Sequence, residues 1–209
     1  DRLVTQLEKE RGIPAGGLYF DLIVETASGV INSNEIAKAS TRTSQMSIGQ
    51  ADLAVSMGFS RGADLNFEQY FYAENRLLFA ARAAGVQAHI LGAQKGADFA
   101  DISLEPEAML TACRRARRMG FMGRSVIHPV WIDACNEGFK PPQEELETAR
   151  KVQTALAAAY AQGKGSVSVD GRMYDVANMR HVEYTLARAE AISRREAQKA
   201  AALARLTGA

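Results

Sequence analysis

The sequence predicts an α/β protein in which strand–helix units build a parallel sheet, followed by a smaller helical module. Three observations support this prediction. Short apolar runs alternate with helix-like segments, the alternation stops near Pro141-Pro142, and the hairpin signal Asp170-Gly171 lies between two later helices. The 209 residues, of which 47% are hydrophobic and 23% charged, suffice for a sizeable buried core.

The elements of the first part follow one another in regular order. The expected strands cover residues 18–25, 46–49, 86–90 and 124–128. The expected helices cover residues 3–10, 29–38, the segment after Asp52, 67–84 and 106–119. Gly85 and Gly120 stand directly after two of these helices, at the position where glycine is favoured, and Pro129 ends the last strand.

Units of this kind build parallel sheets, and eight of them close a (β/α)₈ barrel, which usually needs about 250 residues. About four units are visible here, so residues 1–140 are expected to be the C-terminal part of such a barrel, with the other half preceding this sequence or supplied in some other way. Residues 141–209 are expected to form a helix, the hairpin and a second helix, a module that packs on a neighbouring subunit.

Composition excludes several classes of function. The net charge of +1 lacks the basic excess of a nucleic-acid-binding protein, and the arginines of segments 114–118 and 193–195 are expected on solvated helix faces. No apolar run is long enough to span a membrane and residues 1–8 do not resemble a secretory signal, so a cytoplasmic location is expected. Cys113 and Cys135 have no partner at metal-ligand spacing and are interpreted as reduced, structural thiols.

Two acids are the strongest candidates for a functional site. Glu25 and Asp52 each follow a predicted strand and precede a helical segment. Because the C-terminal ends of parallel strands share one face, these carboxylates can converge, and a pair of carboxylates with room for water suits Mg²⁺. The alternative is local: Asp52 as a helix cap and Glu25 as a solvated strand end.

Other chemistry-bearing residues are weaker candidates. His128 stands at the expected end of a strand, where it could act as a general acid or hydrogen-bond a neighbouring loop, and the rigid Pro129 favours the structural interpretation. Residues 92–96 lack the spacing of a phosphate loop and are interpreted as a connection. His89 and His181 have no acid or cysteine at catalytic spacing and are interpreted as structural or exposed.

Five strings, in this order, are similar to one known family. They are Ile23-Val-Glu25-Thr-Ala-Ser-Gly29, Gly49-Gln-Ala-Asp52-Leu, Ala80-Ala-Arg-Ala-Ala-Gly85, Val126-Ile-His-Pro129 and Asp170-Gly-Arg-Met-Tyr-Asp175. Together they resemble the citrate lyase β-subunit-like proteins of the HpcH/HpaI aldolase superfamily, a group that includes malyl-CoA, β-methylmalyl-CoA and citramalyl-CoA lyases.

The resemblance implies a TIM barrel with a C-terminal extension, assembled as a homotrimer or homohexamer. By position, Glu25 and Asp52 match the two carboxylates that bind Mg²⁺, and Glu25 also lies against the substrate. Asp175 matches a catalytic acid that family members lend to a neighbouring subunit; without the resemblance it reads as the N-cap of the last helix. His128 matches a recurrent strand-end position with a structural role.

The implied activity is a Mg²⁺-dependent cleavage or formation of a carbon–carbon bond in a short 3-hydroxyacyl-CoA. Cleavage would give a 2-oxo acid together with acetyl-CoA from malyl-CoA or citramalyl-CoA, or propionyl-CoA where the carbon next to the thioester carries a methyl group. A bound metal would polarise the oxo acid's carbonyl, and Asp175 would move the α-proton. The alternatives are a malyl-CoA thioesterase and a truncated, non-catalytic homologue that binds a CoA ester. The string Gly49-Gln-Ala-Asp52-Leu has one potential acid fewer than the Gly-Ala-Glu-Asp-Leu of citrate lyases. The family arginine that grips the substrate is expected in the other half of the barrel.

Overall fold

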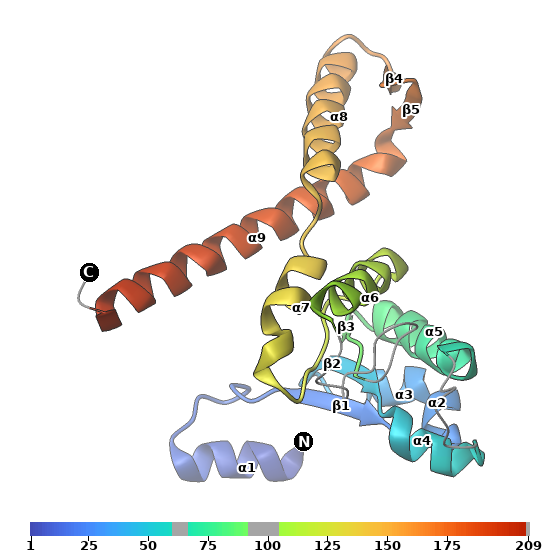
Figure 1. Cartoon of the computed structure of the whole chain (residues 1–209), viewed down its shortest axis with the longest axis vertical. Helices are drawn as coiled ribbons and strands as arrows, with labels where there is room; N and C mark the ends of the chain where they lie inside the picture. The colour runs from blue at the N-terminus through green and yellow to red at the C-terminus, as the bar shows by residue number, and fades with distance from the viewer. Residues whose placement is uncertain (60–66, 92–104, 208–209) are drawn as a thin grey trace. The chain divides into compact units, whose positions relative to one another are not determined.

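The computed structural model of the chain describes residues 1–59, 67–91 and 105–207. It divides into two compact units, Asp1–Phe139 and Lys140–Ala209. Figure 1 labels the elements of both units along the chain.

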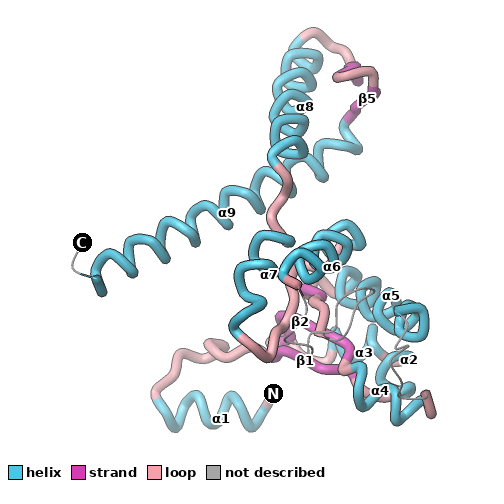
Figure 2. Tube along the Cα trace, viewed as in Figure 1, coloured by secondary structure: helices cyan, strands magenta, loops and turns pink. Residues whose placement is uncertain are grey.

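The first unit alternates strands with helices. Its strands are β1 (Phe20–Val24), β2 (Thr43–Ile48) and β3 (Gln87–Ala88). Its helices are α1 (Arg2–Arg11), α2 (Ala27–Ile31), α3 (Ser33–Lys38), α4 (Gln50–Met57), α5 (Phe67–Ala83), α6 (Pro106–Met119), the 3₁₀ turn η1 (Pro129–Trp131) and α7 (Ile132–Gly138). Figure 2 shows these elements coloured by type along the trace.

The three strands form a parallel sheet in the order β1-β2-β3. The register pairs Val24 with Ile48, so β1 and β2 end side by side and the residues that follow them, Glu25 and Gly49, are neighbours. This parallel α/β arrangement is the fold class that the alternating pattern predicts.

Helices α3 and α5 pack on one face of the sheet. The core there includes Met46 and Leu77, both fully buried, and Val24. On β1 the alternate residues, Asp21 and Ile23, are exposed. The sheet therefore buries one face of this strand, as side-chain alternation requires.

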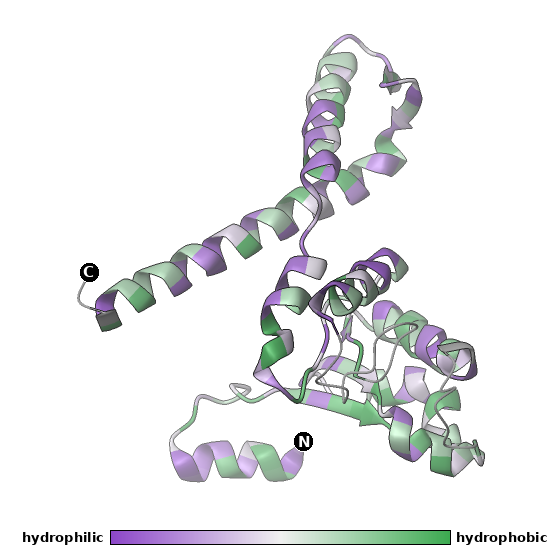
Figure 3. Cartoon of the chain, in the orientation of Figure 1, coloured by the Kyte–Doolittle hydropathy of each residue, from purple (hydrophilic) through white to green (hydrophobic). Residues whose placement is uncertain are grey.

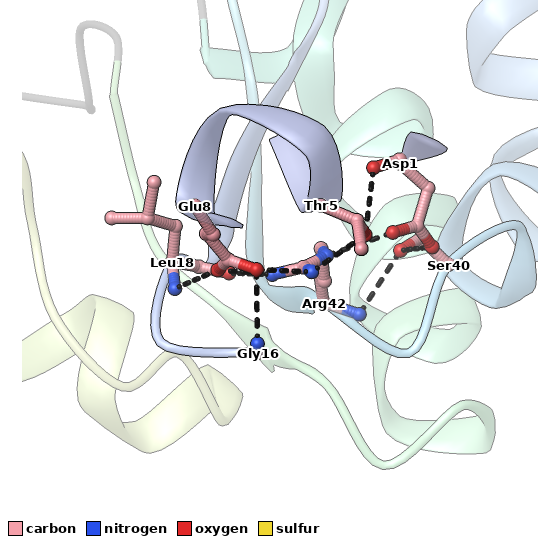
Figure 4. Close-up of polar contacts among 7 residues, drawn as sticks. All are labelled: Asp1, Thr5, Glu8, Gly16, Leu18, Ser40 and Arg42. Atoms are coloured by element: carbon pink, nitrogen blue, oxygen red, sulfur yellow. Dashed lines mark hydrogen bonds and ion pairs between the residues drawn. The ribbon is translucent and has the colours of Figure 1, made fainter. Parts of the chain in front are cut away.

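A buried ion pair fixes α1 on the start of the sheet (Figure 4). Arg42, just before β2, donates hydrogen bonds from Nη1 and Nη2 to the two carboxylate oxygens of Glu8, each at 2.7 Å. The backbone N–H groups of Gly16 and Leu18 also donate to this carboxylate. Arg42 Nε donates to Asp1 Oδ1 at 2.7 Å. With four donors, the buried charge of Glu8 is fully compensated.

The second unit is built from two helices and a hairpin. Its elements are α8 (Gln143–Ala161), β4 (Ser166–Val169), β5 (Arg172–Asp175) and α9 (Val176–Thr207). The turn between the antiparallel strands is made by Asp170 and Gly171, with φ angles of 50° and 78°. Val152 and Leu156 of α8 pack against Val182 of α9. Figure 3 shows hydrophobic and hydrophilic residues mixed along the length of α9.

Two predicted elements of the first unit are wrong in detail. The expected helix over 29–38 is broken at Asn32, whose side chain donates to the carbonyl of Ser28 at 2.9 Å and so competes with the helical hydrogen bonds. Among the described residues, the expected strand over 124–128 forms a single bridge, between Arg124 and Ile90. Its backbone pairing ends at the hydrogen bond from Ser125 to Ile90.

One further expectation concerns residues that the structure does not describe. The segment 92–96, interpreted as a connection, lies outside the described ranges. Within those ranges, none of the helices combines the length and apolar character needed to cross a bilayer.

Candidate functional site

Glu25 is positioned by the end of β1 and the start of α2. It follows Val24, whose carbonyl accepts a hydrogen bond from the N–H of Gly49 at 3.0 Å. It precedes Thr26, which caps α2 by accepting from the N–H of Gly29 at 3.0 Å. The backbone of Glu25 is thus held on both sides, and its side chain is half-buried.

The Glu25 side chain rests against Gly49. A Cβ built on Gly49 would lie 2.6 Å from Glu25 Cγ and 2.9 Å from Glu25 Cδ, and closer still to Oε1. Any side chain at position 49 would therefore occupy the space that the carboxyl group fills. Because Gly49 has no side chain, the Glu25 carboxyl group packs directly against its backbone at the N-terminus of α4. We call this contact the seat of Glu25.

Asp52 lies in the first turn of that same helix and is exposed. The first turn carries backbone N–H groups without helical partners and the positive end of the helix dipole, both of which favour carboxylates. The seat of Glu25 and the position of Asp52 thus bring both predicted acids to one helix N-terminus, next to the ends of β1 and β2.

The donor set fits a hard divalent cation with an incomplete protein shell. Mg²⁺ is usually held by one or two carboxylates, with waters and substrate oxygens as the remaining ligands. Across residues 1–59, 67–91 and 105–207, no cluster of three or more His, Cys, Asp or Glu residues could hold a metal. A pair of carboxylates such as Glu25 and Asp52 is a donor set of the size that Mg²⁺ takes.

A buried polar pair lies next to this site, and the sequence pattern does not predict it. Gln50, the first residue of α4, donates from Nε2 to Oε1 of Glu74 on α5 at 2.9 Å, and both side chains are buried. This bond ties the start of α4, between Gly49 and Asp52, to α5. One sequence signal points to it: Glu74 lies at helical spacing between Tyr70 and Leu77, on the apolar stripe of α5, where a charged side chain needs a buried partner.

His128 makes a local contact. It is exposed, and its Nδ1 accepts a hydrogen bond from the N–H of Val130 at 3.3 Å, which caps the 3₁₀ turn η1. The structural role of His128 stays a prediction.

His89 lies in a different part of the sheet from Glu25. With Gln45 and Gln87 it lines a polar hollow of about 250 Å³, toward the beginnings of β2 and β3. Its Nε2 is 3.8 Å from Oδ2 of Asp21, which also accepts a hydrogen bond from Gln45. Burial lowers the pKa of His89, against the opposing effect of Asp21. A neutral His89 suits a structural role.

Asp175 belongs to the second unit. As the last residue of β5 it caps α9: its Oδ1 accepts from the N–H of Ala177, and its own N–H donates to Oδ1 of Asn178, each at 2.9 Å. The cap expected from the sequence is thus present. His181, further along α9, is exposed and lines a groove of about 500 Å³ with Arg172 and Tyr174.

The fold and this site define a class: a parallel α/β protein with one carboxylate directly after a strand and a second in the first turn of the helix that follows the neighbouring strand. Residues 1–129 match the HpcH/HpaI aldolase/citrate lyase family. The chain belongs to this family, as its sequence strings predict.

Curated relatives support that assignment. The L-malyl-CoA/β-methylmalyl-CoA lyase of Cereibacter sphaeroides is 31% identical over 92% of this chain and 63% of its own length. The citrate lyase subunit β of Leuconostoc mesenteroides subsp. cremoris is 33% identical over 84% of this chain and 55% of its own length. The chain thus spans less than two thirds of these relatives.

Solved structures agree. The CitE protein of Mycobacterium tuberculosis, in complex with magnesium, acetoacetate and coenzyme A, matches 80% of this chain and 60% of its own with a TM-score of 0.65 and 31% identity. A citrate lyase from Burkholderia xenovorans LB400 matches 92% of this chain and 59% of its own with a TM-score of 0.76. At 20% identity the second likeness concerns the fold alone.

Proposed function

We propose that this chain is part of a Mg²⁺-dependent carbon–carbon lyase that acts on a short 3-hydroxyacyl-CoA such as malyl-CoA or citramalyl-CoA. The observation that carries the proposal is the seat of Glu25 against Gly49, at the N-terminus of the helix that bears Asp52. The names of the relatives, a malyl-CoA lyase and a citrate lyase subunit, support the same class of reaction.

Glu25 and Asp52 would hold the metal, and Glu25 would also contact the substrate. When bound, Mg²⁺ supplies Lewis-acid polarisation of the oxo-acid carbonyl. From their place at the first turn of α4, the two carboxylates would fix the position of the metal and, with it, that of the 2-oxo acid.

Asp175 is the proposed acid/base. In the synthetic direction it takes the α-proton of acetyl-CoA or propionyl-CoA, and in cleavage it returns a proton to that carbon. General acid–base catalysis of this kind contributes about 10²–10⁴-fold. We place Asp175 in the site of a neighbouring subunit of a homotrimer or homohexamer, with the sheet of the first unit as part of a (β/α)₈ barrel.

The decisive assay follows glyoxylate, pyruvate and free CoA separately, with malyl-CoA and citramalyl-CoA as substrates. Release of glyoxylate or pyruvate with acetyl-CoA is the expected result. Free CoA without an oxo acid would instead identify a thioesterase. No turnover of either ester, with Mg²⁺ still bound, would identify a non-catalytic homologue that binds CoA esters.

Asp52→Asn tests the metal site within that assay. The variant keeps the size of the side chain but removes one charged ligand, so activity should fall more than about 100-fold, since even partners outside a ligand shell are worth 10–100-fold. The control is Asp133→Asn, an exposed acid in the first turn of α7, and it should keep full activity. Full activity of Asp52→Asn would refute the metal site.

A further inference from the structure

The two cysteines of the chain are 22 residues apart but meet in the fold. Cys113 on α6 donates its thiol hydrogen bond to Cys135 on α7, with 3.6 Å between the sulfur atoms. Both are free thiols, Cys113 fully buried and Cys135 7% exposed. Neither takes part in the proposed lyase chemistry.

A glycine brings these two helices close enough for the contact. Gly138 lies one turn after Cys135 on the same face of α7, and a Cβ built on it would collide with Cys113 Cβ. That Cβ would also lie 3.1 Å from the carbonyl oxygen of Leu110. The backbones of α6 and α7 therefore approach more closely than any other residue at 138 would allow, and the thiols face each other across that approach.

We propose that Cys113 and Cys135 are a modification site at which a small hydroperoxide converts the two thiols into a disulfide that links α6 to α7. A disulfide needs an S–S distance of about 2.05 Å, so the sulfurs must move together by about 1.5 Å.

The chemistry assigns different parts to the two thiols. Cys135 reacts first: its sulfur attacks the peroxide, the O–O bond breaks, and a sulfenic acid and water result when the oxidant is hydrogen peroxide. The Cys113 sulfur then displaces the hydroxyl group, which leaves with the thiol proton as a second water, and the S–S bond forms. Two electrons leave the thiols and reduce one peroxide.

The environment favours this order. Cys135 is the more exposed thiol and accepts the hydrogen bond. That bond, together with the charge of Arg124, lowers the pKa of Cys135, whereas the same bond and burial raise the pKa of Cys113. The thiolate is the nucleophile, so Cys135 attacks and Cys113 resolves.

The test treats the chain with hydrogen peroxide and measures intact mass after alkylation under non-reducing conditions. The wild-type protein should lose about 2 Da as a monomer, yield one cross-linked peptide pair spanning 113 and 135, and revert with dithiothreitol. Two thiols that still alkylate, or a sulfinic acid without a cross-link, would overturn the proposal.

Single variants test the order of attack. In Cys113→Ser the sulfenic acid on Cys135 has no resolving thiol, and dimedone should trap it. In Cys135→Ser the remaining Cys113 should stay unmodified under the same conditions. Trapping on Cys113 but not on Cys135 would reverse the assigned roles, and circular dichroism of each variant confirms that the helices are intact.

Discussion

Position 49 has no room for even a methyl group, because a Cβ there would collide with the side chain of Glu25. The φ of −82° at Gly49 is open to any residue, so the need for glycine at position 49 comes from the Glu25 carboxyl group and not from the backbone. This separates two effects that glycine substitutions usually combine, namely backbone strain and steric exclusion.

Gly49→Ala should therefore displace Glu25 and leave the fold intact. The atoms in the way are the far end of a flexible side chain, so the free energy of unfolding should change by less than about 1 kcal/mol. The melting-temperature increase caused by Mg²⁺ should largely disappear, because one of two proposed ligands has moved. Thermal melts with and without Mg²⁺ measure both quantities.

The matched control is Gly123→Ala. Nothing lies within 4 Å of a Cβ built at Gly123, so this variant should keep the Mg²⁺-dependent shift. An unchanged shift in Gly49→Ala would show that the seat of Glu25 plays no part in metal binding.

At the scale of elements, the Gln50–Glu74 bond holds α4 in place against α5. Gln50→Ala should destabilise the first unit by about 1–3 kcal/mol, because it takes a donor from a buried carboxylate. Chemical denaturation followed by circular dichroism measures the loss.

Gln143→Ala provides the comparison for this pair. Gln143 is likewise the first residue of a helix and donates to a carboxylate, that of Glu147, at 3.0 Å, but both side chains are exposed. We expect a change within about 0.5 kcal/mol. Equal losses in the two variants would mean that burial of the Gln50–Glu74 pair adds nothing.

The attachment of α1 should depend on pH. Hydrogen bonds from Arg42 lower the pKa of Glu8 from 4.5 to about 2, against the opposing effect of burial. Since the folded-state pKa lies below the unfolded one, this stabilisation is complete above about pH 4.5 and is lost as the pH falls toward 2.

Glu8→Gln removes that titration. The urea midpoint of the variant should fall less steeply than that of the wild type between about pH 4.5 and 2. Glu10→Gln, an exposed acid on the same helix, should retain the wild-type slope. Parallel slopes for Glu8→Gln and the wild type would contradict the assignment.

The sequence predicts the elements that local signals define. Asp170-Gly171 specifies the hairpin because both residues adopt positive φ, and the helix expected over 106–119 is α6 as observed. The break at Asn32 depends on the hydrogen bond from its side-chain amide to Ser28. The short strand pairing that ends at Ser125 depends on its partner, Ile90. Neither can be read from periodicity.

In the candidate site, too, the sequence predicts what local signals define but does not predict contacts made by tertiary packing. The positions of Glu25 and Asp52 follow from parallel strand ends, and the Asp175 cap follows from its place before a helix. The Gln50–Glu74 bond and the thiol contact join residues 24 and 22 positions apart through tertiary packing alone. No local pattern encodes such partners, although a buried acid on an apolar stripe points to one.

At the scale of the whole molecule, the proposal divides the active site between subunits. Asp52→Asn and Asp175→Asn should each be inactive alone, and the asparagine at 175 should still cap α9. Co-expressed in one oligomer, they should recover activity at about a quarter of the sites, those that combine an intact metal pair with an intact Asp175 from the next subunit.

Activity of the co-purified mixture measures this complementation. Mixed oligomers that stay inactive would show that Asp175 does not act across a subunit boundary. Oligomers of either variant made separately and then mixed without subunit exchange provide the baseline.

The cap at Asp175 has a chemical consequence for that role. Oδ1 is occupied by the N–H of Ala177, which fixes the plane of the carboxyl group relative to the axis of α9. Oδ2 lies outside this bond. In the proposed role Oδ1 would keep the first turn of α9 capped while Oδ2 faces the substrate, so that one carboxyl group would serve both the helix and the reaction.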